Sequence, residues 1–236
     1  MRQVKIGLLG CGTVGKGFVH LLERNRDLIR ARARVDVVVD KILVRDLRKD
    51  RPGVDPSLLT TRADDVIENG VDAVVELIGG SDPARRFIRD SIVNRKHVVT
   101  ANKAVLSRAG RDLLDLAAVH GVQLRFEASV CGAIPIVRVI HQALAGDHIT
   151  AVRGVVNGTC NFILSRMATE GLDFDAALRL AQEKGFAEAD AALDVDGIDA
   201  AQRRLFRLAL VRAVADQHDA ELVLTDNGPG LRVTLR

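Results

Sequence analysis

Residues 4–17 read VKIGLLGCGTVGKG, an apolar run that ends in the glycine pattern G-x-G-x-x-G. In this pattern Gly10 permits a tight turn, Gly12 lets the backbone approach a pyrophosphate, and Gly15 lets a helix pack closely on a strand. The apolar residues that follow have helical spacing, so the first amides of that helix would point free N–H groups at phosphates. A glycine-rich turn that binds no ligand is the alternative. The order of strand, glycines and helix favours a dinucleotide-binding loop.

The composition is typical of a globular protein. The 236 residues are 47% hydrophobic and 28% charged. No apolar run approaches the ~18–20 residues of a membrane span, and no segment resembles a signal peptide, so we expect a cytoplasmic protein. The net charge of +3 comes from scattered arginines, which argues against nucleic acid as a partner. Metal-ligand spacing and a disulfide framework are both absent from the three cysteines, Cys11, Cys131 and Cys160.

Strands alternate with helices over residues 1–127, which predicts an α/β fold with a Rossmann-type doubly wound parallel sheet. After the first strand, further strands are expected over residues 35–44, 71–78, 97–100 and 122–127. Beyond the helix that follows the glycines, helices are expected over residues 64–69, 83–95 and 111–120.

The end of the second strand distinguishes two cofactors. An acidic residue there binds the ribose 2′-hydroxyl of NAD, whereas an arginine accommodates the 2′-phosphate of NADP. Asp40 would take this position if the strand ended just before it, and Arg45 takes it if the strand runs to residue 44. The β-branched run continues to residue 44, so the sequence favours Arg45 and NADP. The neighbouring Arg48 and Lys49 are equally well explained as solvated charges.

Two short segments follow expected strands at the carboxyl edge of the sheet, where ligands bind in this architecture. Gly79 and Gly80 would let the chain pass close to a ligand. Lys103 stands in the loop after the strand over residues 97–100. A lone lysine in a loop is usually solvated, so a functional and a solvated Lys103 are both open on the residues alone.

Residues 127–135, EASVCGAIP, place small residues between two apolar segments. Glu127 is a hard oxygen ligand and the small residues expose backbone carbonyls, so the segment could hold sodium or a similar cation. An interdomain hinge is the alternative, and the residues alone favour it.

The second half predicts a mixture of helices and one strand. Helices are expected over residues 134–144, 162–169 and 174–184, a strand over 149–156 and a capping turn over 157–161. The loop over residues 185–199 is rich in acidic side chains, and it suits either solvent or a pocket for an ammonium group.

Six stretches resemble motifs of homoserine dehydrogenase. They are GCGTVG at 10–15, VRD at 44–46, TANKA at 100–104, EASVCGAIPI at 127–136, NGTCNFIL at 157–164 and KGFAEADAALDVDGIDAA at 184–201. The resemblance covers about residues 1–201. It implies NAD(P)-dependent interconversion of L-homoserine and L-aspartate 4-semialdehyde, a step of threonine and methionine biosynthesis, in a homodimer.

The resemblance also implies roles for individual residues. Against the cofactor it implies Thr13, Val14, Gly79, Gly80, Lys103 and Gly185, beside the glycines of the loop. It implies a sodium ion held by Glu127 and the carbonyls of Val130, Gly132 and Ile134. For homoserine it implies Glu188 and Asp199 as anchors, with Asp194 beside the reacting hydroxyl.

The chain departs from this family at Arg203. The family has a lysine four residues after the aspartate that matches Asp199, and here Arg203 stands there. Arginine has a pKa above ~12 and keeps its proton, so it cannot exchange the hydroxyl proton as a lysine can. The resemblance thus implies Lys103, Asp194 and Arg203 as the catalytic positions, with proton exchange impaired at Arg203.

Residues 208–236 also differ from the family. They predict a helix over 208–218 and two strands over 220–225 and 231–236, which resemble the closing helix and β-hairpin of a histidine-kinase ATPase domain. The nucleotide-binding boxes of that family are missing, so no kinase activity follows. We interpret this tail as the product of a mis-joined frame or chimera, joined near residues 202–208, with a divergent dehydrogenase ending as the alternative.

The sequence thus predicts a dinucleotide-binding domain over residues 1–127, an incomplete α+β substrate domain over 128–202 and a tail over 203–236. The function it favours is that of a homoserine dehydrogenase using NADP, or NAD, and a sodium ion. The alternative is a catalytically inactive NADP-binding remnant of a mis-joined gene. The six motifs favour the enzyme, whereas Arg203 and the tail favour the remnant.

Overall fold

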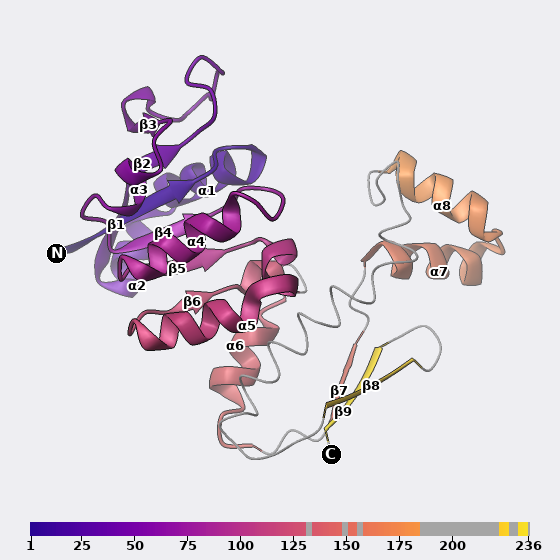
Figure 1. The fold of residues 1–236 in the computed structure, drawn as a ribbon. Coiled ribbons are helices and arrows are strands. Elements are labelled where there is room, and N and C mark those ends of the chain that lie inside the picture. The colour runs from indigo at the N-terminus through magenta and orange to yellow at the C-terminus, as the bar shows by residue number, and fades with distance from the viewer. Residues whose placement is uncertain (131–133, 148–150, 155–157, 185–221, 227–230, 236) are drawn as a thin grey trace. The chain divides into compact units, whose positions relative to one another are not determined.

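The computed structural model describes residues 1–130, 134–147, 151–154, 158–184, 222–226 and 231–235 (Figure 1). The chain divides into two compact units, Met1–Ser129 and Val130–Arg236. In the described residues, no helix is both long enough and apolar enough to cross a bilayer.

The first unit is built on a parallel sheet of six strands in the order β3-β2-β1-β4-β5-β6. The strands are β1 Arg2–Leu9, β2 Val35–Leu43, β3 Leu59–Thr60, β4 Ala73–Glu76, β5 His97–Thr100 and β6 Leu124–Arg125. The chain adds strands in one direction from β1 to β3 and then in the other from β4 to β6. The direction reverses between β1 and β4, and ligands bind at such a switch point in doubly wound sheets. The predicted α/β fold is confirmed.

The helices of this unit lie on both faces of the sheet (Figure 1). They are α1 Thr13–Arg24, α2 Arg26–Ala33, α3 Asp64–Ile67, α4 Ala84–Val93 and α5 Lys103–Val119. Alternate strand residues supply two apolar clusters, because successive side chains point to opposite faces. One contains Leu8, Ile42 and Val75 with Val19 of α1. The other contains Leu9, Leu43 and Val74 with residues of α3 and Phe87 of α4.

Two helices differ from the sequence prediction. The helix expected over residues 111–120 begins eight residues earlier, at Lys103, because the Asn102 side chain accepts a hydrogen bond from the Val105 amide and caps it. The sequence pattern also missed α2, which Asn25 separates from α1. Lys103 is therefore the first residue of a helix and does not lie in a loop.

An ion cluster connects α2 to the neighbouring strand. None of the residues of α2 is buried, so apolar packing contributes little to its position. Arg26 donates to both oxygens of Asp36 at 2.9 and 2.8 Å, and Arg30 does the same at 2.9 and 2.7 Å. These two guanidinium groups hold the pKa of Asp36, in β2, far below its usual range.

The second unit contains short helices and an antiparallel sheet. Its helices are α6 Ile136–Arg138, continued by a π-helical turn Val139–Ala143, and α7 Gly158–Glu170 and α8 Phe174–Glu183. Ile163 of α7 packs with Ala177 and Ala181 of α8. The sheet has the order β7-β9-β8, with β7 Ala151–Gly154, β8 Leu222–Asp226 and β9 Leu231–Leu235.

The helix and strand predictions for the second unit hold in outline. The turn expected over residues 157–161 is different, because α7 already begins at Gly158. The two strands expected near the C-terminus are present as β8 and β9, and they pair with each other. The helix expected over residues 208–218 lies outside the described residues.

We predict that Asp36→Asn lowers the stability of the first unit at neutral pH, because two arginines lose their anionic partner. The carboxylate has a lowered pKa when folded, so its contribution is complete above the unfolded value of about 3.9 and declines as the pH falls below it. Urea unfolding at pH 7 and near pH 3 measures this. The gap in midpoint between variant and unsubstituted chain should shrink at the lower pH.

The matched control is Asp27→Asn, since Asp27 is fully exposed and its ion pair with Arg30 is longer, at 3.7 Å. Its midpoint should hardly change. Equal losses in the two variants would contradict a special role for Asp36.

Candidate functional site

The glycine loop joins β1 to α1 at the switch point of the sheet. Gly10 has a positive φ of 98°, and a β-carbon on it would lie 3.0 Å from the carbonyl oxygen of Leu77. A β-carbon on Gly15 would overlap the carbonyl oxygen of Gly10. Both glycines are therefore required by the protein's own packing, as the sequence predicts.

Gly12 differs from both of these glycines. Its φ is −81°, which any residue can adopt, and among the described residues no atom beyond its two chain neighbours lies within 4 Å of the position that its β-carbon would occupy. The fold therefore leaves open space over this residue. That space, with a glycine beneath it, is what a backbone needs if a pyrophosphate is to lie against it.

Helix α1 begins at this open space. Gly12 is its N-cap residue and supplies no side-chain cap, and its first turn contains no acidic residue. Thr13 and Val14 are the first residues of the helix, and Val14 is 64% exposed despite being apolar. An uncapped helix N-terminus attracts anions, so the loop has the features that fit the phosphates of a dinucleotide.

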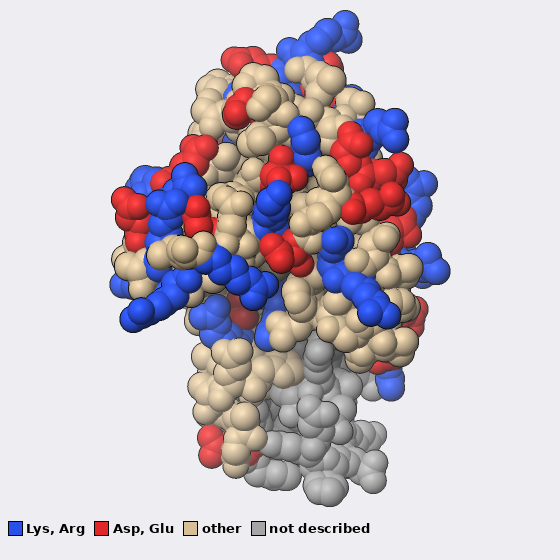
Figure 2. Space-filling view, turned by 90° about the vertical axis from the view of Figure 1, so that its left-hand side faces the viewer, with Lys and Arg blue, Asp and Glu red and all other residues tan. Residues whose placement is uncertain are grey.

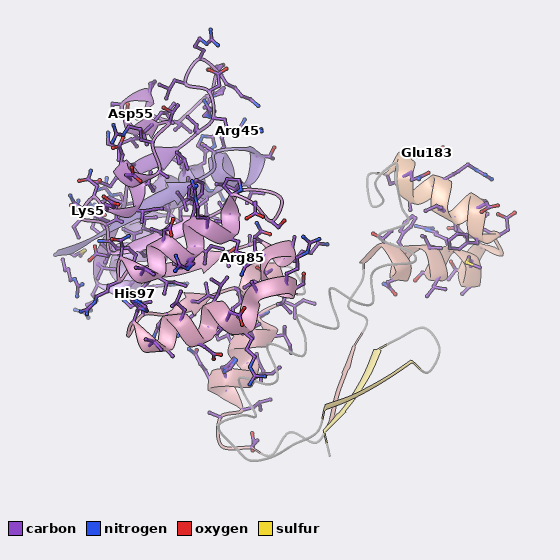
Figure 3. All side chains as sticks on the ribbon, in the orientation of Figure 1. Lys5, Arg45, Asp55, Arg85, His97 and Glu183 are labelled. Carbon is purple, nitrogen blue, oxygen red and sulfur yellow. The ribbon has the colours of Figure 1, made fainter. Side chains whose placement is uncertain are left out.

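Strand β2 ends at Leu43, and this supports the later of the two positions that the sequence left open. Arg45 lies two residues beyond the strand and is exposed (Figure 3). Asp40 lies within the strand, where the register between β1 and β2 shifts, and its carboxylate is 3.3 Å from the ammonium group of Lys5. Within the described part of the chain, Arg45 forms no ion pair. Its charge is thus available to a 2′-phosphate.

Charges of both signs are interspersed on the face that Figure 2 shows. This agrees with the scattered arginines of the sequence. Arg48, for example, pairs with Asp46 at 3.4 Å. The position of an individual cationic side chain is therefore a better guide to phosphate binding than the net charge of the chain.

The loop after β4 and the start of α5 are joined by hydrogen bonds. Asn102 donates from Nδ2 to the carbonyl oxygens of Ile78 at 2.8 Å and Gly80 at 2.7 Å. Gly79 and Gly80 are exposed, and Lys103 follows Asn102 directly. The structure thus brings these three predicted residues onto neighbouring segments at the carboxyl edge of the sheet.

Sequence reasoning missed three buried polar residues here, namely Glu76, Thr100 and Asn102. Glu76 is a carboxylate in an otherwise apolar strand, and this unusual position could have indicated a functional residue. Asn102 precedes a helical stretch, which is typical of an N-cap.

The predicted cation ligands are described only in part. Glu127 begins a 3-10 turn, Glu127–Ser129, and is partly buried. Val130 is buried and Ile134 is 58% exposed, whereas Gly132 lies outside the described residues. The sodium site stays a prediction.

The predicted substrate and proton-exchange residues fall in a part of the chain that is not described. These residues are Glu188, Asp194, Asp199 and Arg203, and Gly185, which the resemblance implies against the cofactor, lies in the same part of the chain. Their roles also stay predictions.

Two family models match this chain. The model described as "Homoserine dehydrogenase, NAD binding domain" matches residues 10–127. The model described as "Homoserine dehydrogenase" matches residues 135–222. The second match continues past residues 202–208, where the sequence suggested a junction. That hypothesis stays a prediction, which the gene sequence across codons 198–210 would test.

The chain is also similar to individual homoserine dehydrogenases. Homoserine dehydrogenase of Bacillus subtilis is 42% identical over 205 residues, which are 86% of this chain and 47% of that protein. A crystal structure of the enzyme from Thiobacillus denitrificans has a TM-score of 0.78 at 44% identity, covering 86% of this chain and 47% of that one. The chain spans about half the length of the curated relatives it matches.

A hyperthermophilic archaeal homoserine dehydrogenase in complex with NADPH shares the fold. Its TM-score is 0.75 at 22% identity, and the match covers 99% of this chain and 82% of that one.

We predict that Gly12→Val leaves the chain folded but lowers its affinity for NADP at least about tenfold, because the new side chain would hold the phosphates away from the backbone amides. Hydrogen bonds to charged groups contribute ~1.5–3 kcal/mol each. Calorimetric titration with NADP and a urea midpoint for the same sample would measure both quantities.

Gly17→Val is the matched control, since Gly17 lies in α1, the helix that Gly12 precedes, and also has open space at its β-carbon. It should bind NADP as the unsubstituted chain does. Unchanged affinity in folded Gly12→Val would remove this loop from the site.

Proposed function

The chain belongs to the homoserine dehydrogenase family, and from that premise we propose that it binds NADP and interconverts L-homoserine and L-aspartate 4-semialdehyde. The observation that carries the proposal is the open space over Gly12 beside an uncapped helix, in a domain of the NAD-binding type. The interconversion transfers a hydride and a proton, and the nicotinamide supplies the hydride chemistry when bound. The protein supplies orientation, anchors and proton exchange.

The cofactor would lie along the switch point of the sheet. Residues 10–15 would hold the pyrophosphate through their amides, and Arg45 would receive the 2′-phosphate of NADP. Gly79, Gly80 and Lys103 would lie near the nicotinamide. The preference for NADP over NAD rests on Arg45 and on the pairing of Asp40 with Lys5.

The substrate residues are proposed from the resemblance. Glu188 and Asp199 would hold the homoserine, Asp194 would lie beside the reacting hydroxyl, and Lys103 or Arg203 would face the proton exchange. Arginine keeps its proton at any working pH, so a chain that relies on Arg203 would react slowly.

A sodium ion is proposed at Glu127, with the carbonyls of Val130, Gly132 and Ile134 as further ligands. All of these are oxygen donors, which alkali and alkaline-earth cations prefer over nitrogen or sulfur. A homodimer in the cytoplasm is the assembly and location that we expect, and sedimentation of the purified chain would test the first.

We predict that Arg45→Ala weakens NADP binding about tenfold while NAD binding changes little, because only NADP carries the 2′-phosphate and a charge-assisted hydrogen bond contributes ~1.5–3 kcal/mol. Parallel titrations with the two cofactors measure the ratio. Arg48→Ala is the control, since Arg48 already pairs with Asp46. Equal losses for NAD and NADP in Arg45→Ala would show that Arg45 does not read the phosphate.

We also predict that the chain oxidises L-homoserine slowly and that Arg203→Lys raises kcat by about 10²–10⁴, which is the usual worth of general acid–base catalysis. NADPH formation at saturating homoserine is the measurement. If NADP binds and Arg203→Lys gives no turnover, the chain is an inactive cofactor-binding protein. Fast turnover before any substitution, lost in Lys103→Ala, would assign the proton exchange to Lys103.

A further inference from the structure

A buried carboxylate lies at the carboxyl end of β4. Glu76 is fully buried, and its Oε2 accepts a hydrogen bond from Thr100 Oγ1 at 2.5 Å. Its Oε1 accepts from the amide of Ile78 at 2.6 Å. Burial raises the pKa of Glu76, and within the described residues no lysine or arginine pairs with it. A buried carboxyl group without a cationic partner costs stability, so packing alone does not account for it.

Thr100 links Glu76 to the segment that follows β5. Glu76 and Thr100 are direct neighbours in the parallel register of β4 and β5. The Thr100 hydroxyl donates to Glu76 and accepts from the amide of Asn102 at 3.0 Å. The Thr100 carbonyl oxygen accepts from Ser129 Oγ at 3.0 Å. The hydroxyl therefore fixes the backbone where β5 leads into α5.

The Asn102 carboxamide joins two segments that end at this edge of the sheet. Its Oδ1 accepts from the Val105 amide at 3.1 Å and caps α5. Its Nδ2 donates to the carbonyl oxygens of Ile78 and Gly80, and lies 3.5 Å from Glu76 Oε1. One side chain thus sets the position of the loop over residues 78–80 relative to the first turn of α5.

We propose that Asn102, held by Thr100 and Glu76, is a positioning residue that sets the place of the nicotinamide end of the cofactor. This inference rests on the proposed function, since it takes the loop over residues 78–80 and Lys103 as neighbours of the nicotinamide. Asn102 acts through these two segments. The adenosine end, on the glycine loop and Arg45, does not depend on it.

The test separates the two ends of the cofactor with two probes. NADPH carries the nicotinamide, and 2′-phosphoadenosine diphosphoribose lacks it. The chain contains no Trp or Tyr, so the emission of bound NADPH can be read without a protein background. The informative variant is Asn102→Ser, because serine is also a good N-cap residue but cannot reach both carbonyl oxygens.

Asn102→Ser should bind 2′-phosphoadenosine diphosphoribose within about twofold of the unsubstituted chain. Its affinity for NADPH should fall about tenfold, because the loop over residues 78–80 and the first turn of α5 are no longer held in place for the nicotinamide, and the emission change on binding should be smaller. If homoserine is turned over, kcat should fall about tenfold to a hundredfold with little change in the KM for homoserine, because misplacement of reacting groups acts on the rate.

Thr100→Val is the second variant, and it has a matched control on the same sheet. The Thr60 hydroxyl likewise donates to a carboxylate, Asp65 at 2.6 Å, and accepts from the amide two residues later, that of Arg62 at 3.1 Å. Thr100→Val should impair NADPH binding while Thr60→Val should not, and Thr100→Ser should restore it. A general loss of folding would instead weaken both probes together.

The outcomes distinguish the two proposals. NADPH affinity and emission that are unchanged in folded Asn102→Ser and Thr100→Val would overturn the positioning role and leave the proposed function intact. An unsubstituted chain that binds neither probe would overturn both.

Discussion

The approach of Gly15 to the carbonyl oxygen of Gly10 is the contact on which the first unit depends. No β-carbon separates the first turn of α1 from the end of β1 at this point. Val19, one turn further along α1, can therefore pack in the apolar cluster that contains Leu8 and Ile42. Strand β1 pairs with β2 on one side and with β4 on the other. A shift of α1 would thus disturb the strand to which both halves of the sheet are attached.

Five of the six strands of the first unit could be predicted from the sequence because their signal is local, whereas the two-residue strand β3 could not. Runs such as residues 35–44 are β-branched, and side chains that alternate between faces need no partner to be recognised. Helix α2 could not be found in this way. It buries no residue, and Asp36, which holds Arg26 and Arg30, lies in the following strand. Its position is set by an ion cluster that hydrophobic periodicity does not reveal.

In the candidate site, too, the residues with a local signal could be predicted, and those that the sheet brings together could not. The positive φ of Gly10 and the contact of Gly15 with the Gly10 carbonyl oxygen are decided within a few residues, so the motif predicts both glycines correctly. Glu76 precedes Thr100 and Asn102 by more than twenty residues in the chain, and only the pairing of β4 with β5 makes Glu76 a neighbour of Thr100. Sequence alone offers an odd carboxylate in an apolar strand and a good helix cap. Their connection is a property of the sheet.

Two physical requirements are combined in one glycine motif. Gly10 and Gly15 are required by the packing of the protein itself, because a side chain at either position would meet backbone atoms. Gly12 has a backbone conformation open to any residue, and in the described part of the chain no atom beyond its chain neighbours lies close to the place of a side chain. A glycine-rich turn that binds nothing would need only the first two. The packing of the described residues does not require the third glycine, Gly12. It is the N-cap residue of α1, whose N-terminus has no side-chain cap. Gly17 also has open space at its β-carbon, but it lies more than one turn into α1, so only Gly12 combines open space with the helix N-terminus that a phosphate group would approach.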